Sequence, residues 1–438
     1  MRDVIQFVAL LILGAPPFAL VLLTLARFST KDLSEARIQQ LTSWIFGVGM
    51  VGAIALACAL LTLQSPRIIV DLGSVLSLRS YHFDLAMELT PTTLTLLILT
   101  FLLSTLVSSY SSRYLHRDPG FFRFYVLLIL FAFGMELIVT AHSLTLLFAG
   151  WEFVGMTSAI LIAFYNERRG PSRHGLRAYA TYRATDIGLL LAVAILEYTV
   201  HSAEFERLGE VSLPPATMTL VAFLIIFGAM GKGGILPFTG WLPKAMEGPT
   251  PSSAIFYGAL SVHASPYLLI RSMPLIERVP EGRVVIVVLG CLTAIYATAV
   301  GRTRADIKTA LAYASCAQVA LIWVEVGLGF EELALVHIVG HAVLRTWQLL
   351  RSPSILVDFA GTAQKRRAST SLGAWFYRHS LAEWHLDDVG KVLILRPIGR
   401  FLRLADALDS VLRRSLGAGD DRGGIERLSS SPEKEQDS

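Results

Sequence analysis

Residues 143–165 read "SLTLLFAGWEFVGMTSAILIAFY", and this stretch decides the fold class. It is long enough to cross the roughly 30 Å hydrocarbon core of a bilayer as a helix that rises about 1.5 Å per residue. Its one charged side chain, Glu152, lies well inside the run. The stretch therefore predicts a membrane-spanning helix that keeps a carboxylate within the membrane.

The composition of the whole chain extends this prediction. Of 438 residues, 53% are hydrophobic and 16% are charged, whereas about a quarter of the residues in soluble domains are charged. We expect an all-α polytopic membrane protein with about 11 transmembrane helices. The first run contains Pro16-Pro17 and exceeds the apolar core of a signal peptide, so we interpret it as a span. The runs lie at residues 4–26, 42–63, 91–110, 121–141, 143–165, 178–198, 216–238, 253–270, 284–300, 307–329 and 332–350.

The positions of the basic residues predict the orientation of the chain. By the positive-inside rule, we expect the N-terminus outside and the C-terminus in the cytoplasm. Arg271, Arg278 and Arg283 lie in an even-numbered loop and are exceptions. The loops after odd-numbered spans carry Arg27, Lys31, Arg37, Arg113, Arg117, Arg168, Arg169, Arg173, Arg177, Arg302, Arg304, Lys308, Lys365, Arg366 and Arg367.

The segments outside the spans divide the chain further. Residues 67–89 alternate apolar and polar side chains, which predicts a short extracytoplasmic hairpin with Gly73 at its turn. Residues 1–358 form the transmembrane bundle. Residues 359–415 carry a cytoplasmic or interfacial amphipathic helix, which Pro397 should kink. Residues 416–438 lack apolar periodicity and are expected to be disordered.

A series of ionisable side chains lies within consecutive predicted spans. Each one costs at least a few kcal/mol in hydrocarbon unless it is paired or hydrated, so a series is typical of an ion pathway. The candidates are Glu152, Arg183, Asp186, Lys232, His263, His337, His341 and Arg345, with Lys308 nearer the surface. The cysteines Cys58, Cys291 and Cys316 are scattered singly and suggest neither a disulfide framework nor a thiolate metal site.

The surroundings of Lys232 predict an interrupted helix. Proline removes a backbone donor and glycine lets other backbone approach closely, so a continuous helix is disfavoured here. Interrupted helices in membranes are tolerated where protein or a water-filled cavity satisfies the freed backbone groups, as at ion-translocating sites. We therefore expect Glu152 and Lys232 to form a switchable ion pair. The residues expected to break the helix are Gly231, Gly233, Gly234, Pro237, Pro249 and Pro251.

Structural interpretations stand beside the functional ones. Arg183 and Asp186 are spaced i, i+3 and could simply satisfy each other. His337 and His341, at i and i+4, fit a proton relay, two ligands of a zinc site or satisfied polar packing. His263 is open between relay and packing, and Lys308 between an interfacial anchor and an entry path.

Five motifs, taken in order, resemble a known family. They are "LLFAGWEFVGMTSAILIAFY", "YRATDIGLLLA", "GKGGILPFTGWLPKAMEGPTPSSA", "RADIKTALAYASCAQVA" and "HIVGHAVLRT". This pattern resembles the antiporter-like membrane subunits of respiratory complex I and the Mrp cation/proton antiporters, especially the NuoL-type branch. The resemblance implies movement of H+ or Na+ along charged residues at the membrane midplane. It pairs Glu152 with Lys232, has Asp186 tune the pair, and continues the relay through His337 and His341.

The sequence departs from the family pattern at several positions. Tyr257 stands where a histidine is usual, and His263 where Thr or Lys is common. Arg345 replaces a lysine, and because Arg does not deprotonate it can anchor charge but hardly carry protons. The family's second five-helix repeat is shortened after Asp358.

A shortened NuoL-like chain with "PSSAIFYGALSVHA" resembles the DabB family of membrane subunits of the DAB inorganic-carbon accumulation complex. That resemblance implies a bacterial inner-membrane protein and a large cytoplasmic DabA-like partner. It places a zinc site like that of β-carbonic anhydrases in the partner, with no cofactor and no metal in this chain. It implies that ion flow drives hydration of CO2 to bicarbonate.

Three classes of function therefore compete. The first is an ion-conducting subunit, either for inorganic carbon accumulation or within a complex I-like or Mrp-type antiporter. The second is a membrane enzyme, for which the chain offers neither a nucleophile with its base nor a complete metal site. The third is a non-conducting membrane anchor for a cytoplasmic enzyme. We favour the transport subunit and expect no nucleic-acid partner.

Overall fold

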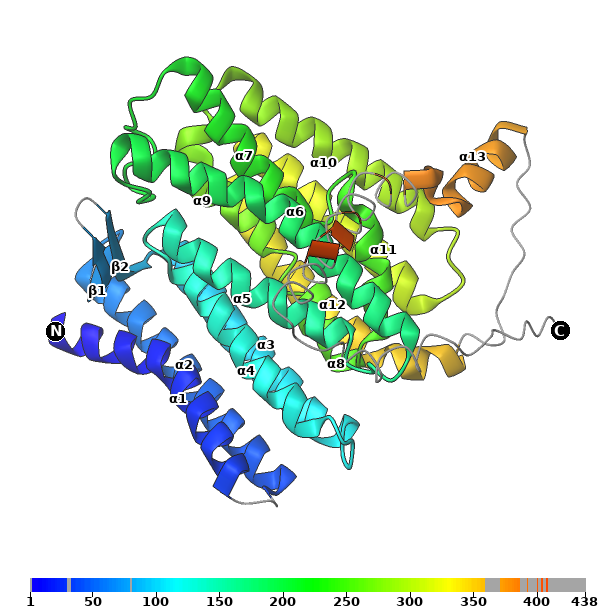
Figure 1. Cartoon of the computed structure of the whole chain (residues 1–438), viewed down its shortest axis with the longest axis horizontal. Helices are drawn as coiled ribbons and strands as arrows, with labels where there is room; N and C mark the ends of the chain where they lie inside the picture. The colour runs from blue at the N-terminus through cyan, green and yellow to red at the C-terminus, as the bar shows by residue number, and fades with distance from the viewer. Residues whose placement is uncertain are drawn as a thin grey trace. The chain divides into compact units, whose positions relative to one another are not determined.

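The computed structural model describes residues 2–29, 33–78, 81–358 and 371–386, together with isolated positions between 392 and 408. The chain divides into two compact units, Met1–Asp387 and Asp388–Ser438. The first unit, which contains the elements labelled in Figure 1, extends further than the bundle of residues 1–358 expected from the sequence. Most of the predicted amphipathic helix, and the whole of the predicted tail at 416–438, lie outside the described residues.

The first unit is a helical bundle with one β-hairpin. Among the described residues, nine helices are long and apolar enough to span a membrane. Its longer helices are α1 (Arg2–Ser29), α2 (Glu35–Leu63), α3 (Pro91–Tyr114), α4 (Phe121–Thr140), α5 (Leu144–Ile162), α6 (Arg169–Val200), α7 (Pro215–Gly233), α9 (Ala264–Ile276), α10 (Pro280–Gly301), α11 (Ile307–Gly327), α12 (Glu331–Asp358) and α13 (Ser371–Leu381). The prediction of an all-α polytopic membrane protein is confirmed. The other two predicted spans lie in α6, which carries several charges, and in the interrupted segment that ends in α9.

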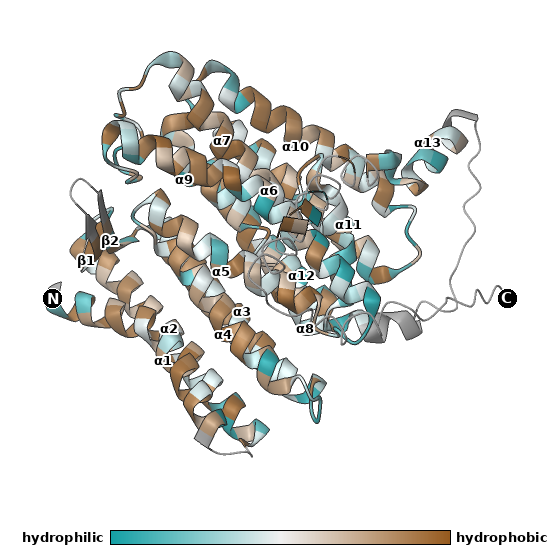
Figure 2. Ribbon diagram, viewed as in Figure 1, coloured by the Kyte–Doolittle hydropathy of each residue, from teal (hydrophilic) through white to brown (hydrophobic). Residues whose placement is uncertain are grey.

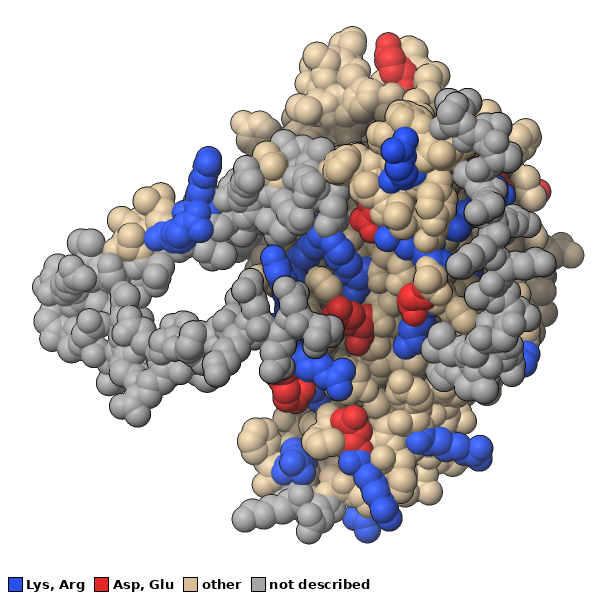
Figure 3. Space-filling view, turned by 90° about the vertical axis from the view of Figure 1, so that its right-hand side faces the viewer, with Lys and Arg blue, Asp and Glu red and all other residues tan. Residues whose placement is uncertain are grey.

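Apolar side chains cover the outside of the bundle as well as its core. Figure 2 shows hydrophobic residues along the lengths of the helices and hydrophilic residues toward their ends. On α10, Val284, Leu292 and Ile295 are all more than half exposed. This pattern is expected where lipid takes the place of water around a helix. Figure 3 shows many Lys and Arg side chains, with some Asp and Glu among them, on the side of the molecule that lies to the right in Figure 1. The orientation inferred from basic residues stays a prediction.

The hairpin pairs β1 (Ile68–Leu78) with β2 (Tyr81–Leu89) in antiparallel register, from Ile68 opposite Leu89 to Leu78 opposite Tyr81. The predicted hairpin is present, but the prediction that Gly73 forms its turn is wrong. Gly73 lies inside β1, where the register shifts between Asp71 and Ser74, and it has a φ of 105°. A glycine accepts this backbone conformation because it has no Cβ, which suits a β-bulge.

Local side-chain caps explain where several helices start. The Thr90 hydroxyl accepts a hydrogen bond from Thr93 N, and the Thr93 hydroxyl accepts one from Thr90 N. Helix α3 therefore begins with a reciprocal cap. Ser143 caps α5 at Leu146 N, and Asp306 caps α11 at Thr309 N. Such caps satisfy backbone donors that a helix leaves free at its N-terminus.

The interruption expected near Lys232 is present. Helix α7 ends at Gly233, and Gly234 follows in the left-handed conformation with a φ of 62°. Two short 3-10 helices, η1 (Phe238–Trp241) and η2 (Pro243–Glu247), continue the chain. The Trp241 indole donates to Gly231 O at 2.9 Å, and Cys316 Sγ donates to Gly234 O at 3.1 Å. Protein groups thus satisfy carbonyls that the ended helix leaves free, as a membrane interior requires.

The run at residues 253–270, which was expected to form one of the spans, is interrupted in the structure. The chain forms the short helix α8 (Thr250–Ser252) and the π-helix η3 (Ser253–Tyr257) instead, and α9 begins only at Ala264. Pro249 is the N-cap of α8 and Pro251 lies in its first turn, where proline is tolerated, so the irregular backbone follows these prolines. Figure 1 shows the resulting irregular segment beside α12, which contacts η3 and α8.

Beyond α12, the described residues return to the bundle. Helix α13 contacts α10 and the 3-10 helix η4 (Glu383–His385), and the Tyr296 hydroxyl on α10 donates to Glu383 O at 3.4 Å. Arg304 Nη2 lies 3.1 Å from Glu383 Oε1 and donates to Leu381 O at 3.3 Å. These contacts explain why the first compact unit extends to Asp387.

Candidate functional site

Lys232 lies in the last turn of α7, and its side chain is fully buried. Its Nζ atom lies 3.6 Å from Asp186 Oδ2, and it has no hydrogen-bond partner among the described residues. The ammonium lies 4.8 Å from the ring centroid of Trp151 and 4.6 Å from that of Tyr182, which favours a cation there. A desolvated lysine between two aromatic rings is held by one carboxylate and by ring electrostatics.

Two glycines let the neighbouring helices approach this lysine. A Cβ added at Gly231 would overlap the side chain of Thr185 on α6, so the glycine allows α7 to lie against α6. A Cβ added at Gly155 would lie 2.9 Å from Lys232 Nζ. Gly231 was expected only as a helix breaker, and Gly155 was not singled out from the sequence. Their second role, close approach of helices, depends on contacts between segments far apart in the chain.

Asp186 is the common partner of the buried charges. Its Oδ1 accepts a hydrogen bond from the Trp151 indole at 2.6 Å, and its Oδ2 accepts one from Arg183 Nη2 at 2.9 Å. Arg183 also forms an ion pair with Glu152. The prediction of a direct ion pair between Glu152 and Lys232 is therefore wrong, because Arg183 pairs with Glu152 while Lys232 faces Asp186. The four charges form one connected cluster, and the i, i+3 contact of Arg183 with Asp186 is part of it.

Tyr257 belongs to the same region but does not contact the charges directly. Its hydroxyl donates to Ser158 O at 2.7 Å, and its ring packs against Trp241, with 5.7 Å between the ring centroids. Trp241 in turn packs edge-on against Tyr182, with 4.9 Å between centroids. Tyr257 thus helps to fix the aromatic side of the lysine site.

A second group of polar residues joins the interrupted segment to α12. His263 immediately precedes α9, and its Nε2 lies 2.9 Å from His341 Nδ1. His263 Nδ1 contacts Ala259 O. Arg345 is buried one turn beyond His341 and donates to Gln348 Oε1 at 2.8 Å. The structure brings His263, His341 and Arg345 together near one end of the interrupted segment.

His337 and Lys308 have partners that the sequence did not indicate. His337 lies between Glu325, 2.8 Å from its Nδ1, and Gln318, 2.9 Å from its Nε2. The rings of His337 and His341 are 6.4 Å apart between centroids. Within the described residues, no group of three or more His, Cys, Asp or Glu side chains could hold a metal ion. Lys308 donates to Thr250 Oγ1 at 2.9 Å, next to the interrupted segment.

Glu136 was missed from the sequence although it lies within a predicted span. It is fully buried in α4, and neither carboxyl oxygen has a hydrogen-bond partner among the described residues. Glu325 was missed in the same way. The signal was available for both, since each is a carboxylate inside an apolar run, which is by default a candidate functional residue.

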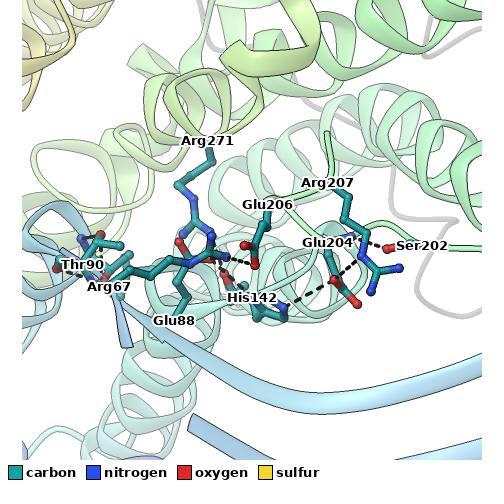
Figure 4. A network of polar contacts seen from close by, with 12 residues as sticks. Arg67, Glu88, Thr90, His142, Ser202, Glu204, Glu206, Arg207 and Arg271 are labelled. Carbon is teal, nitrogen blue, oxygen red and sulfur yellow. Dashed lines mark hydrogen bonds and ion pairs between the residues drawn. The ribbon is translucent and has the colours of Figure 1, made fainter. Parts of the chain in front are cut away.

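Glu88 forms an ionic network at the hairpin (Figure 4). Arg271 Nη2 lies 2.7 Å and Arg67 Nη2 3.3 Å from Glu88 Oε2, and His142 Nδ1 lies 3.5 Å from the same atom. Burial by itself raises the pKa of Glu88. The contact with His142 and the charges of Arg271 and Arg67 outweigh that effect and hold the pKa below its ordinary value of 4.5.

This lowered pKa predicts a pH-dependent contribution to stability. A carboxyl with a lowered folded-state pKa stabilises the fold above its unfolded pKa, and the contribution is lost as pH falls through the folded pKa. We expect Glu88→Gln to lower the melting temperature at neutral pH, and the difference from the wild type to shrink below about pH 4.5. Thermal unfolding in detergent across pH measures this, with exposed Glu210→Gln as control. A difference that stays constant across pH would contradict the prediction.

The sequence and the architecture are both similar to those of known proteins. Residues 141–371 match the family model "NADH:quinone oxidoreductase/Mrp antiporter, TM", and residues 76–125 match "NADH-Ubiquinone oxidoreductase (complex I), chain 5 N-terminus". NADH-ubiquinone oxidoreductase chain 5 of Metridium senile is 35% identical over 277 residues, covering 63% of this chain and 46% of the relative. NAD(P)H-quinone oxidoreductase chain 5 of Synechocystis sp. is 33% identical over 290 residues, covering 64% of this chain and 43% of the relative.

Solved structures share the fold. The Mrp complex from Dietzia sp. DQ12-45-1b contains a chain with a TM-score of 0.68 and 24% identity, covering 83% of this chain and 38% of that one. A chain of the membrane-bound sulfane sulfur reductase, an archaeal respiratory membrane complex, has a TM-score of 0.71 and 16% identity, covering 89% and 82%. The chain spans less than half the length of the curated relatives named above. The matched motifs, the family model and the shared fold agree: the chain belongs to the NADH:quinone oxidoreductase/Mrp antiporter transmembrane family.

Proposed function

We propose that the chain conducts protons or cations through its buried charged residues, and that this flow drives inorganic carbon accumulation by a zinc-containing, carbonic-anhydrase-like partner. The observation that carries the conduction is Lys232. It is fully buried at the end of an interrupted helix, 3.6 Å from Asp186 and without a hydrogen bond among the described residues. A lysine can release its proton when desolvated, and a nearby carboxylate favours its return.

The remaining charges extend the site toward α5 and toward α12. Toward α5, Arg183 links Asp186 to Glu152. Toward α12, His263 contacts His341, and Arg345 lies one turn further along that helix. Each buried charge is costly in hydrocarbon unless it is paired or hydrated, and such chains are typical of ion pathways. Arg345 retains its proton in this scheme and anchors charge beside His341.

A protein partner is supported by the exposure of the Glu152 end. The side chains of Glu152 and Arg183 are 30% and 33% exposed, although both lie near the middle of their helices. Ionisable groups at that depth rarely face lipid and instead meet protein or a water-filled cavity. A neighbouring subunit on this face would complete the site. The DabA-like identity of a cytoplasmic partner rests on the sequence resemblance.

The relatives, which are chain 5 subunits of NADH-ubiquinone and NAD(P)H-quinone oxidoreductases and a chain of an Mrp complex, favour a second candidate, a subunit of a complex I-like or Mrp-type cation/proton antiporter. In that case the same charges move ions, but the coupled reaction belongs to other membrane subunits. The two candidates differ in the partner that copurifies. A large soluble zinc protein favours carbon accumulation, and a set of antiporter or respiratory subunits favours the second candidate.

The test combines partner identification with one substitution. The complex is purified from native membranes, and uptake of labelled bicarbonate is measured in cells that depend on it. We expect Glu152→Gln to reduce uptake about 10-fold or more, because Gln keeps the size of Glu but cannot ionise. Glu167→Gln, in the exposed connection after α5, is the matched control and should retain uptake. Full uptake by Glu152→Gln at normal membrane abundance would eliminate conduction and favour the anchor.

A further inference from the structure

One face of α9 leads from the central histidines toward the hairpin. His263, Tyr267 and Arg271 follow each other at steps of four residues and share this face. The Tyr267 hydroxyl donates to Val139 O at 2.6 Å and accepts from Arg271 Nη1 at 2.9 Å. A cavity of about 10 Å³ lies beside His263 and Tyr267, with otherwise apolar walls. That volume is close to the least that holds one water molecule.

Arg271 then connects this face to the hairpin. Its Nη2 donates to Glu88 Oε2 at 2.7 Å and to Ala141 O at 3.1 Å. The side chains of Arg271 and Glu88 are 9% and 8% exposed, so this ion pair is buried. One guanidinium therefore holds both the Tyr267 hydroxyl oxygen and the Glu88 carboxylate. Arg271 keeps its own proton and acts as a positioning residue.

His142 stands between Glu88 and a second carboxylate (Figure 4). Its Nδ1 lies 3.5 Å from Glu88 Oε2, and its Nε2 lies 3.8 Å from Glu204 Oε2. Backbone hydrogen bonds fix it there, since His142 N donates to Ala86 O of β2 and His142 O accepts from Phe205 N. Each ring nitrogen thus faces a different carboxylate. Arg67, Glu206 and Arg207 are the other charged groups of this network.

The Glu204 side of His142 opens into a polar cavity of about 330 Å³ between the hairpin, the start of α5 and the end of α6. Its walls include His142, His201 and four carboxylates, Asp71, Asp84, Glu197 and Glu204. Thr145 donates to Glu197 Oε1 at 2.9 Å. The cavity is large enough for many water molecules, and its net negative lining favours protons and cations.

We propose that His142 shuttles protons between the buried carboxylate of Glu88 and this acidic cavity, at the outer end of a branch that leaves the central histidines along α9. The inference rests on the proposed conduction of protons. A neutral imidazole can accept a proton at one nitrogen and release one from the other, and here the two nitrogens face the two sides of the branch.

The transfer is a series of proton hops without net chemistry. A proton from the His263 side reaches the Glu88 carboxylate by way of water beside Tyr267, whose hydroxyl is held by the same Arg271 guanidinium that binds Glu88. The Glu88 carboxyl passes the proton to His142 Nδ1, and the proton on Nε2 leaves to the Glu204 carboxylate and then to water in the cavity. The ring ends neutral with its tautomer exchanged, and a ring flip restores the starting state. The same steps run in reverse.

The experiment measures proton flux through the intact complex in liposomes that contain a pH-sensitive dye. We expect His142→Ala to reduce flux about 10-fold or more at neutral pH, as loss of a positioned proton-transfer group does. Added imidazole should restore flux, because a free imidazole can occupy the space and carry the proton. A purely structural role for His142 would not give this rescue. Glu88→Gln keeps an acceptor oxygen toward Arg271 and should also lose flux.

The matched control is His201→Asn. His201 lines the same cavity and has a φ of 53°, a conformation that Asn accepts, so this variant should keep wild-type flux without imidazole. Wild-type flux in His142→Ala, or a loss that imidazole does not reverse, would overturn the proposal. If His142→Ala does not assemble, His142→Gln is measured instead, and wild-type flux in it has the same meaning. Lys232→Ala is measured in the same experiment. Wild-type flux in Lys232→Ala would refute the proposed conduction itself. Loss of flux in Lys232→Ala with wild-type flux in His142→Ala would refute only the branch through His142.

Discussion

Lys232→Ala is expected to abolish ion movement while the protein still reaches the membrane. The substitution removes the only buried ammonium that faces Asp186 among the described residues and leaves Arg183 as the one cation paired with that carboxylate there. It also empties the space between the rings of Trp151 and Tyr182. The site then lacks a group that can hold a proton and release it in that position. Flux in proteoliposomes, normalised to the amount of protein incorporated, measures the effect.

Lys232→Arg separates charge from proton exchange. Guanidinium keeps the positive charge but does not deprotonate in proteins, so this variant should also lose flux. The larger guanidinium must also fit where the lysine Nζ lies close to Gly155, at which an added Cβ would be only 2.9 Å from that atom. Lys244→Ala, in the 3-10 helix η2, is the control and should conduct normally. Wild-type flux in Lys232→Ala at normal abundance would show that the lysine is not part of the pathway. Wild-type flux in Lys232→Arg would show that the residue at this position need not release its proton.

Asp186→Asn should give the second-largest loss. Asp186 accepts hydrogen bonds from Trp151 and Arg183 and attracts Lys232. Asn has one acceptor oxygen and a donating amide, so at least one of these partners must face a donor. Removing one partner of a buried ion pair costs about 3–5 kcal/mol, because the other charge stays buried. We expect flux to fall by about 10-fold or more and the melting temperature to fall with it.

Asp306→Asn is the control for this change. Asp306 caps α11 by accepting a hydrogen bond from Thr309 N at 2.7 Å, and Asn caps helices about as well as Asp. Flux and melting temperature should both stay close to wild type. An Asp186→Asn variant with normal flux would mean that Lys232 exchanges protons without a charged partner on α6.

Much of the fold was accessible from the sequence because lipid imposes strong local rules. The run at residues 143–165 corresponds closely to α5, and the Gly and Pro residues after Lys232 correspond to the end of α7. The exceptions are irregular backbone. Gly73 could form a turn or a bulge equally well, and only the pairing of β1 with β2 decides between them. The interruption between Ser253 and His263 is not visible as a polar break, because the residues there are buried in protein.

The residues that belong to the site were easier to predict than the ion pairs that they form with one another. Every ionisable residue in an apolar run is a candidate, which was enough to select Lys232, Asp186 and the histidines. The choice of partners depends on how α5, α6 and α7 rotate against each other. That rotation is set by small-residue contacts such as Gly231 with Thr185, which one sequence does not reveal. Hence Arg183, and not Lys232, is the direct partner of Glu152.

The position of Trp151 gives the protein an internal optical reporter. Its indole donates to Asp186 at 2.6 Å and lies 4.8 Å from the Lys232 ammonium, so both charges act directly on the ring. Indole emission responds to nearby charge, and a proton that moves between the two groups changes the field across the ring. In a variant that keeps Trp151 as its sole tryptophan, fluorescence would follow the occupancy of the site during turnover. The residue that helps to hold the charges together thus also makes their state observable without an added label.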